Sequence, residues 1–183
     1  VTIRINPGLG SGHNNRTNVG GPASSFGIWH SDLDRVPEIQ TKHDLKITRL
    51  HTHIGSGADP KIWERCAQLS LNIASRLPDV QTVNLGGGFK VGRMPDEPSA
   101  DLQKIGHRVA EAVTDFHRQH GRKLKLEIEP GTFIVARAGA LIFTVIDTAD
   151  TGPDGYAFLK TDGGMTEILR PSLYGAQHPI WVV

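Results

Sequence analysis

Three segments that follow strand-like runs contain the small, polar and glycine residues that could hold an anion. They are His53–Gly57 (His-Ile-Gly-Ser-Gly), Asn84–Gly88 (Asn-Leu-Gly-Gly-Gly) and Glu129–Gly131 (Glu-Pro-Gly). Glycines let backbone N–H groups approach an anion closely, and a helix that follows such a turn directs the positive end of its dipole toward it. Each segment alone is an ordinary turn. Three convergent segments predict a phosphate-binding site.

Two histidines lie two residues apart in one of these runs, so both side chains point to the same face. A metal pair is one interpretation of His51 and His53. It requires further ligands at later strand ends, where this sequence has glycines and a single glutamate, and we predict no metal. For His53 we favour an imidazole packed against a flat ring ligand. For His51 we favour a hydrogen-bonded histidine of the core.

Two charged residues have open interpretations. Glu129 ends an apolar run, where its carboxylate could pair with a protonated nitrogen of a ring ligand. It could equally be a surface or capping carboxylate, and its position alone does not decide between them. Arg170 could bind a substrate carboxylate through two hydrogen bonds, or it could simply be solvated.

Repeated strand–loop–helix units position these residues. Alternating or apolar runs predict strands at 1–5, 46–54, 80–85 and 123–128, and helical spacing predicts helices at 32–43, 60–77 and 100–120. Asp59 and Pro60 are placed to start the second helix, and Gly121 to stop the third. Such alternation predicts parallel strands in an α/β fold, with a (β/α) barrel as the leading candidate and its site at the C-terminal strand ends.

The pattern changes after Gly139. Two β-rich runs, 141–147 and 156–162, flank a turn sequence without an intervening helix, which predicts an antiparallel hairpin. We therefore predict that residues 1–138 are part of the barrel and that residues 139–183 begin a β-domain.

Composition limits the class of protein. The 183 residues are 38% apolar with a formal net charge of +1, which is typical of a globular protein and does not favour a nucleic-acid partner. No apolar run approaches the roughly 20 residues that span a bilayer. The absence of a signal-peptide pattern and the single cysteine, Cys66, favour the cytoplasm, and helical spacing places Cys66 in the core. The chain opens and closes in strand-like sequence, so we expect an internal segment of a longer polypeptide.

The order of the motifs carries a family resemblance. The ordered blocks are Arg4–Gly8 with Gly12-His13, Gly20-Gly21 and Ser25–Ile28, then His53–Gly57, Leu85–Phe89, Glu127–Gly131, Asp162–Met165 and Arg170–Gly175. Together they resemble the fold-type III pyridoxal-phosphate-dependent decarboxylases, the family of the diaminopimelate and ornithine decarboxylases, and the diaminopimelate branch most closely. The resemblance implies part of an alanine-racemase-like (β/α)8 barrel that leads into a C-terminal β-domain.

The resemblance also implies a cofactor and roles for residues. The cofactor is pyridoxal 5'-phosphate, with His53 stacked on its ring, Ser56 and Gly86, Gly87 and Gly88 at its phosphate, and Glu129 at its ring nitrogen. The adjoining Pro130, Gly131 and Thr132 are assigned to the same site. Arg170 and Tyr174 are expected to contact an amino-acid substrate in a homodimer. The family has arginine where Thr132 stands, so a bidentate donor is lost there.

The implied reaction is decarboxylation of meso-diaminopimelate to L-lysine. The change at Thr132 keeps a related decarboxylase for another basic amino acid, of the ornithine or lysine type, as an alternative. A non-catalytic regulatory relative is the other. By the same resemblance the Schiff-base lysine precedes Val1 and the catalytic cysteine follows Val183. We therefore expect no catalytic residue in this segment, which alone should be inactive.

Overall fold

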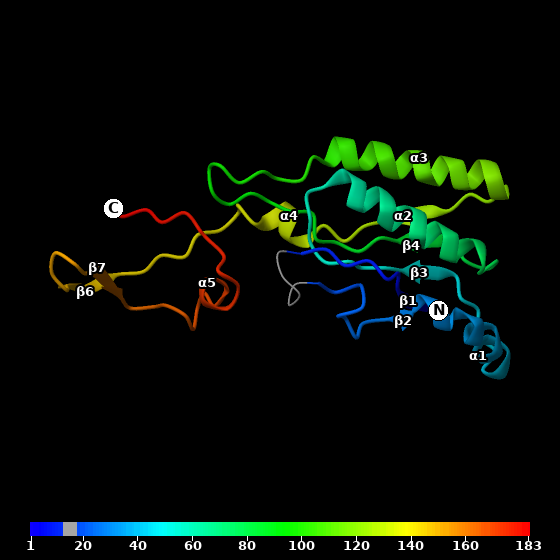
Figure 1. The fold of residues 1–183 in the computed structure, drawn as a ribbon, viewed down its shortest axis with the longest axis horizontal. Coiled ribbons are helices and arrows are strands. Elements are labelled where there is room, and N and C mark those ends of the chain that lie inside the picture. The colour runs from blue at the N-terminus through cyan, green and yellow to red at the C-terminus, as the bar shows by residue number, and fades with distance from the viewer. Residues whose placement is uncertain (13–17) are drawn as a thin grey trace. The chain divides into compact units, whose positions relative to one another are not determined.

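A sheet of five parallel strands forms the centre of the first part of the chain (Figure 1). The computed structural model describes residues 1–12 and 18–183, so His13 of the first motif lies outside the described residues. The strand order is β2-β1-β3-β4-β5, and every neighbouring pair is parallel. The strands are β1 (Thr2–Asn6), β2 (Ile28–Trp29), β3 (Arg49–His51), β4 (Thr82–Asn84) and β5 (Lys125–Glu127). The predicted parallel α/β architecture is confirmed.

One strand of this sheet was not predicted. In β2, Ile28 and Trp29 pair with Ile5 and Asn6 of β1. Two residues are too few to produce an alternating pattern, so β2 is recognisable only through its partner strand. Of the other four strands, β1 extends one residue beyond its predicted run, and β3, β4 and β5 lie within their predicted runs but are shorter.

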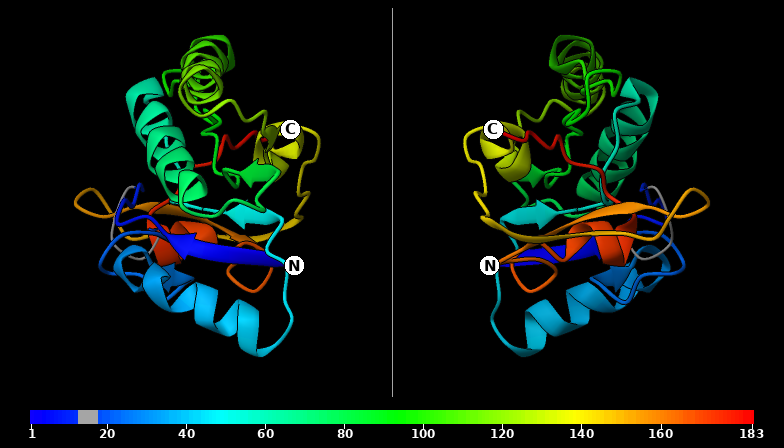
Figure 2. Two further views of the ribbon diagram at one scale, coloured as in Figure 1. Left: turned by 90° about the vertical axis from the view of Figure 1, so that its right-hand side faces the viewer. Right: turned by 90° about the vertical axis from the view of Figure 1, so that its left-hand side faces the viewer.

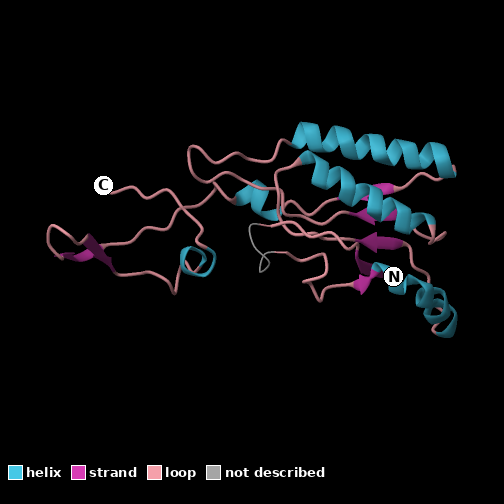
Figure 3. Cartoon of the chain, in the orientation of Figure 1, coloured by secondary structure: helices cyan, strands magenta, loops and turns pink. Residues whose placement is uncertain are grey.

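The two long helices lie side by side, on the same side of β3 and β4 in both views (Figures 1 and 2). They are α2 (Pro60–Ser75) and α3 (Leu102–His120). The shorter helices, also drawn in Figure 3, are the 3₁₀ helix η2 (His30–Arg35), α1 (Val36–Lys42), α4 (Gly131–Val135) and α5 (Arg170–Tyr174). The last two were not predicted, because five residues cover little more than one turn.

The predicted helix ends of α2 and α3 are confirmed. The Asp59 side chain accepts a hydrogen bond from the Lys61 N–H at 2.9 Å, and Pro60 is the first residue of α2. A cap of this kind satisfies an N–H group that has no partner within the helix. Gly121 ends α3 in the left-handed conformation, with φ of 67°.

The core lies between the strands and the two long helices. In β3 and the residues after it, Leu50, Thr52 and Ile54 are buried while the alternate residues His51 and His53 are only partly buried. The period of two therefore directs one face of the strand toward the helices. The other large buried residues of this core are Ile5, Leu33, Val36, Ile47, Trp63, Leu71, Ile73, Leu77, Val80, Val83, Leu85, Phe89, Ile105, Val109 and Phe116.

A buried polar cluster joins β3 to α2. The Thr52 hydroxyl lies 2.9 Å from the Ser70 hydroxyl, and Ser70 donates to the Cys66 carbonyl at 2.8 Å. Cys66 is fully buried, which confirms its predicted place in the core. Burial raises the pKa of its thiol to about 11, so the group stays protonated and chemically inert.

The chain divides into two compact units. The first comprises residues 1–91 and 98–134, and the second comprises residues 92–97 and 135–183. In the second unit, β6 (Val145–Asp150) and β7 (Ala157–Thr161) form an antiparallel pair, which confirms the predicted hairpin. The domain limit at residue 138 stays a prediction. Among the helices of the described residues, none is both long and apolar enough to cross a membrane.

Gly106, within α3, allows the stability of this helix to be tested by a single substitution. A Cβ added at Gly106 would meet no atom within 4 Å. Gly106→Ala should therefore raise the free energy of unfolding by about 0.5–1 kcal/mol, because alanine loses less backbone entropy on entering a helix. Denaturant or thermal unfolding of the full-length protein measures the change. A loss of stability would show that the space beside Gly106 is filled.

Candidate functional site

Strand register brings the polar residues of three strands into one row. His51 of β3 is aligned with Asn84 of β4, and Asn84 is aligned with Glu127 of β5. Aligned residues of parallel neighbours point to the same side of the sheet. This side is opposite to the one that Leu50 and Val83 present to the helices. The row therefore lies on the face away from α2 and α3, near the C-terminal strand ends where (β/α) barrels bind ligands.

Glu129 lies two residues after Glu127, just beyond the end of β5, and contacts the other two residues of this row. Its Oε1 atom accepts a hydrogen bond from the Asn84 side-chain amide at 2.9 Å and lies 3.6 Å from Nε2 of His51. Asn84 thus holds one carboxylate oxygen, and because the side chain is 53% exposed the carboxylate remains accessible. Whether this carboxylate meets a ring ligand or is a surface carboxylate stays open at this point.

His53 contacts the glycine turn. The Gly87 N–H donates to Nδ1 of His53 at 3.3 Å, which requires that nitrogen to be unprotonated. A neutral imidazole then carries its proton on Nε2. The imidazole of His53 is therefore neutral and partly buried just after β3, and its packing against a ring ligand stays a prediction.

The Gly86–Gly88 turn is packed too tightly for any side chain. A Cβ on Gly87 would lie 2.0 Å from the carbonyl oxygen of Glu129, and a Cβ on Gly88 would lie 1.7 Å from that of Gly55. Gly86 and Gly88 also have positive φ values, of 74° and 97°. The glycines therefore let three strand ends pack against one another.

The amide donors of this turn are partly engaged. Gly86 donates its N–H to Oδ1 of Asn84 at 2.7 Å, and Gly87 donates to His53. Gly88 donates to neither of these residues. Any role of Gly86 and Gly87 beside an anion must therefore come from close backbone approach, because their N–H groups already have acceptors.

The loop after β3 is joined to the loop after β1. The Ser56 N–H donates to the carbonyl of Ser11 at 3.0 Å, and the Ser11 hydroxyl donates to the carbonyl of Ser56 at 2.9 Å. The Gly57 N–H donates to the carbonyl of Gly88 at 3.0 Å. These three hydrogen bonds fix the loop and leave the side chain of the exposed Ser56 at the surface.

Ion pairs join the strands on the same face of the sheet. They involve Arg49 and Lys125, which lie two residues before His51 and Glu127. Nε and Nη2 of Arg49 lie 2.7 and 2.6 Å from Oε2 of Glu127, and Nζ of Lys125 lies 3.4 Å from its Oε1. The Arg49 contact lowers the pKa of the Glu127 carboxyl, and Lys125 adds to this effect. Glu127 therefore remains ionised and joins β3 to β5.

Burial lowers the pKa of both histidines on this face. For His53, the positive charge of Arg4 and the neighbouring His51 add to the lowering, and Glu129 opposes it. For His51, desolvation outweighs the raising effect of Glu129. Both imidazoles are therefore neutral near pH 7.

These shifts predict a pH dependence of stability. A histidine whose pKa is lower in the folded state binds its proton more weakly there than in the unfolded chain, whose value is near 6.5. The stability that His51 and His53 contribute is thus fully present above that value and is lost as the pH falls below it. Unfolding of the full-length protein should show a lower stability at about pH 5.5 than at about pH 7.5. In a variant with glutamine at both positions, this slope should become shallower, and an unchanged slope would contradict the assignment.

Other residues predicted for the site have different surroundings. Pro130, Gly131 and Thr132 follow Glu129 where α4 begins, and Gly131 and Thr132 are exposed. Arg170 and Tyr174 belong to α5 in the second unit, where the Arg170 guanidinium lies 5.5 Å from the centre of the Tyr174 ring. The predicted contact of these two residues with substrate stays a prediction.

Sequence reasoning missed the role of one residue of the site and left that of a second open. Asn84 was predicted only as the start of a turn, although it joins Glu129 to the turn that contains Gly86. The expectation of a hydrogen-bonded core histidine at His51 stays a prediction, since its buried Nε2 lies 3.6 Å from Oε1 of Glu129 and has no hydrogen-bond partner of normal length among the described residues. An asparagine two residues before a glycine turn is the one sequence signal that could have indicated the role of Asn84.

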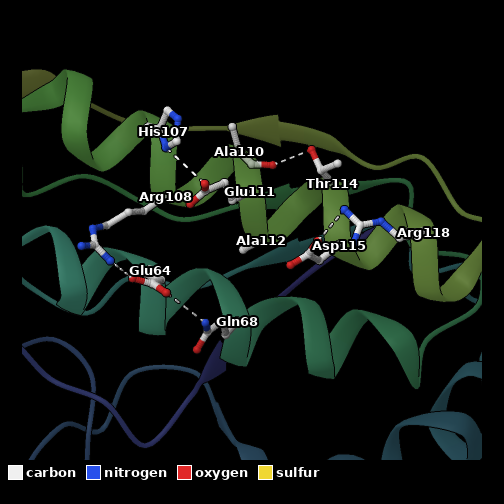
Figure 4. A pocket seen from close by; sticks show the side chains of 10 residues that line it. All are labelled: Glu64, Gln68, His107, Arg108, Ala110, Glu111, Ala112, Thr114, Asp115 and Arg118. Atoms are coloured by element: carbon white, nitrogen blue, oxygen red, sulfur yellow. Dashed lines mark hydrogen bonds and ion pairs between the residues drawn. The ribbon is translucent and has the colours of Figure 1, made fainter.

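A groove of about 440 Å³ between α2 and α3 does not mark the site (Figure 4). Its charged side chains pair with one another. Glu64 lies 2.5 Å from Arg108, and Asp115 lies 3.0 Å from Arg118. A ligand would have to displace these pairs, whereas Oε2 of Glu129 has no hydrogen bond or ion pair with the residues that the structure describes.

A parallel sheet with polar residues and a glycine turn at its C-terminal strand ends is typical of an α/β ligand-binding domain, of which the (β/α) barrel is one class. Comparison with known proteins agrees with this class. Residues 1–136 match the family model described as "Pyridoxal-dependent decarboxylase, pyridoxal binding domain". Diaminopimelate decarboxylase of Escherichia coli strain K12 is 35% identical over 181 residues, which cover 98% of this chain and 43% of that protein. The Streptomyces coelicolor enzyme of the same name is 35% identical over 184 residues, which cover 100% and 41%.

Solved structures show the same relationship. A crystal structure of diaminopimelate decarboxylase has a TM-score of 0.87 at 34% identity, with 98% of this chain and 42% of that chain covered. The Helicobacter pylori enzyme complexed with L-lysine has a TM-score of 0.84 at 28% identity, with 97% and 44% covered.

The chain belongs to the pyridoxal-dependent decarboxylases, and residues 1–136 correspond to their pyridoxal-binding domain. It spans about two fifths of the length of the curated relatives that it matches. The five parallel strands are accordingly part of the alanine-racemase-like barrel that the motifs predicted, and this expectation is confirmed.

Proposed function

We propose that the full-length protein is a pyridoxal 5'-phosphate-dependent decarboxylase that converts meso-diaminopimelate into L-lysine and CO2. The observation that carries the proposal is the convergence of His53, the Gly86–Gly88 turn and Glu129 at adjacent strand ends. The substrate is supported by the relatives, which are named diaminopimelate decarboxylase, and by a similar structure that is complexed with L-lysine.

The residues at the strand ends fit the chemical groups of this cofactor. A neutral imidazole, His53, suits a flat aromatic ring, and the accessible carboxylate of Glu129 suits a protonated ring nitrogen. The exposed Ser56 and the side-chain-free surface of Gly88 suit a phosphate group. Three different groups on three strand ends thus match three parts of one ligand.

The chain's own residues would bind and orient this ligand. When bound, pyridoxal phosphate supplies an electron-accepting ring that stabilises the negative charge left at the α-carbon as CO2 departs. Glu129 would hold a proton on the ring nitrogen, since its negative charge favours the protonated form. His53 would cover one face of the ring, and its neutral state avoids placing a positive charge there.

Recognition of the amino acid is assigned to the second unit and to α4. Arg170 would pair with a carboxylate of the substrate, and Tyr174, whose ring lies beside that guanidinium, would support it. Pro130, Gly131 and Thr132 would border the cofactor, and the Thr132 hydroxyl would donate a single hydrogen bond. The proposal also includes a cytoplasmic location and a homodimer. Sedimentation analysis of the full-length protein would test the homodimer.

The experiment is a substrate comparison with the purified full-length protein and added pyridoxal phosphate. Release of CO2 should be fastest from meso-diaminopimelate and slower from L-lysine and L-ornithine. Release from ornithine or lysine but not from diaminopimelate would favour the related decarboxylase. Absence of both CO2 release and visible cofactor absorbance would favour a non-catalytic relative and would overturn the proposal.

A further inference from the structure

The Nε2 atom of His51 lies beside the Glu129 carboxylate. It is buried, has no hydrogen-bond partner among the described residues, and lies 3.6 Å from Oε1 of Glu129. A buried polar atom without a partner is costly, so its position calls for a reason. Oε1 of Glu129 is the group toward which this nitrogen can donate after a shift of a few tenths of an ångström.

Asn84 donates a hydrogen bond to the same oxygen, and its own side chain is held in place by a second hydrogen bond. Its side-chain amide donates to Oε1 at 2.9 Å, its side-chain oxygen accepts the Gly86 N–H at 2.7 Å, and the residue is 1% exposed. Asn84 therefore cannot turn away without breaking the glycine turn. Two groups on adjacent strands thus converge on one oxygen and leave the second, Oε2, for a ligand.

We propose that His51 is a positioning residue, which together with Asn84 fixes Oε1 of Glu129 so that Oε2 is presented to the ring nitrogen of the cofactor. The inference rests on the proposed function, since it concerns the ring nitrogen of pyridoxal phosphate. It adds a residue with no direct ligand contact, whose effect passes through Glu129.

The neutral state of His51 suits this role. Desolvation by burial is the largest effect on its pKa, and the charges of Arg4 and Arg49 lower it further. A neutral imidazole with its proton on Nε2 can donate to the carboxylate without cancelling its charge. The negative charge of Glu129 then remains available to the ring.

The test compares two ligands that differ at the ring nitrogen alone. The full-length protein, freed of cofactor, is titrated with pyridoxal phosphate and with its deaza analogue, in which carbon replaces that nitrogen. The ratio of the two dissociation constants isolates the contribution of the nitrogen, because the phosphate and the aldehyde are the same in both ligands. Wild-type protein should prefer pyridoxal phosphate.

His51→Leu should reduce this preference by about fivefold, since a loosely held carboxylate forms a weaker charged hydrogen bond. His51→Gln, which keeps an N–H donor near the position of Nε2, should restore most of the preference. His107→Leu on the exposed face of α3 is the matched control and should keep the wild-type ratio.

The outcomes separate the inference from the function on which it rests. If His51→Leu keeps the wild-type ratio of the two dissociation constants, the inference is overturned while the proposed cofactor stands. This holds also where both ligands bind more weakly by the same factor, because the residue is then merely structural. Failure of the wild-type protein to bind either ligand would overturn the proposed function itself.

Discussion

Glu129→Gln in the full-length protein should lower the rate of decarboxylation by about 10²–10³-fold, the effect expected when one preorganised electrostatic contact at the reacting group is lost. Glutamine has the shape of glutamate, and its side-chain oxygen can still accept the hydrogen bond that Asn84 donates. The substitution therefore removes the negative charge with little change in geometry. Without that charge the ring nitrogen loses its proton more readily, and the ring accepts electrons less well.

The measurement is kcat for meso-diaminopimelate together with the pH dependence of the cofactor's visible absorbance. Glu127→Gln is the matched control, because Glu127 lies two residues earlier on the same face but pairs with Arg49 and Lys125. It should affect stability and leave kcat within about threefold of the wild-type value, a change below 1 kcal/mol. A Glu129→Gln enzyme with the wild-type rate would remove Glu129 from the mechanism.

Gly88→Ala should destabilise the protein by about 3 kcal/mol or more, because it combines a steric clash with a strained backbone. The new Cβ would lie 1.7 Å from the carbonyl oxygen of Gly55, a distance that forces the backbone to move. The φ of 97° is also unfavourable for any residue with a side chain. Since the turn lies between two strand ends, movement there should also weaken binding of pyridoxal phosphate.

The same glycine-to-alanine change at Gly106 provides the comparison, because that site is open and helical. The two variants should change the free energy of unfolding in opposite directions. Denaturant unfolding measures both effects, and fluorescence titration measures cofactor affinity. A Gly88→Ala protein with wild-type stability would show that the loop after β3 can move aside without loss.

Much of the fold could be predicted from local patterns. The apolar spacing of α2, the Asp59 cap and the Gly121 stop are properties of neighbouring residues, so the sequence contains them directly. The strand β2 and the helices α4 and α5 escaped prediction because each is too short for a periodic pattern. Of these three elements, β2 forms through its pairing with β1, which a pattern within its own two residues cannot reveal.

The site could be predicted in part for the same reason. His53 and the Gly86–Gly88 turn follow apolar runs, and the motif order identified the family, which the comparison confirmed. The individual roles of the site residues stay predictions. The place of Asn84 between Glu129 and Gly86 could not be predicted, because Glu129 lies just beyond another strand and is 45 residues away in sequence.

The sequence by itself determined that this chain has alternating strands and helices, that its polar and glycine residues stand at strand ends, and that its family is the pyridoxal-dependent decarboxylases. Only the tertiary structure decided which atoms meet. The register of β3, β4 and β5 aligns His51 with Asn84 and Asn84 with Glu127, and so aims two nitrogens at one oxygen of Glu129. The physical reason is that periodicity determines the face on which a side chain lies, whereas hydrogen-bond partners depend on alignment between strands that are distant in sequence.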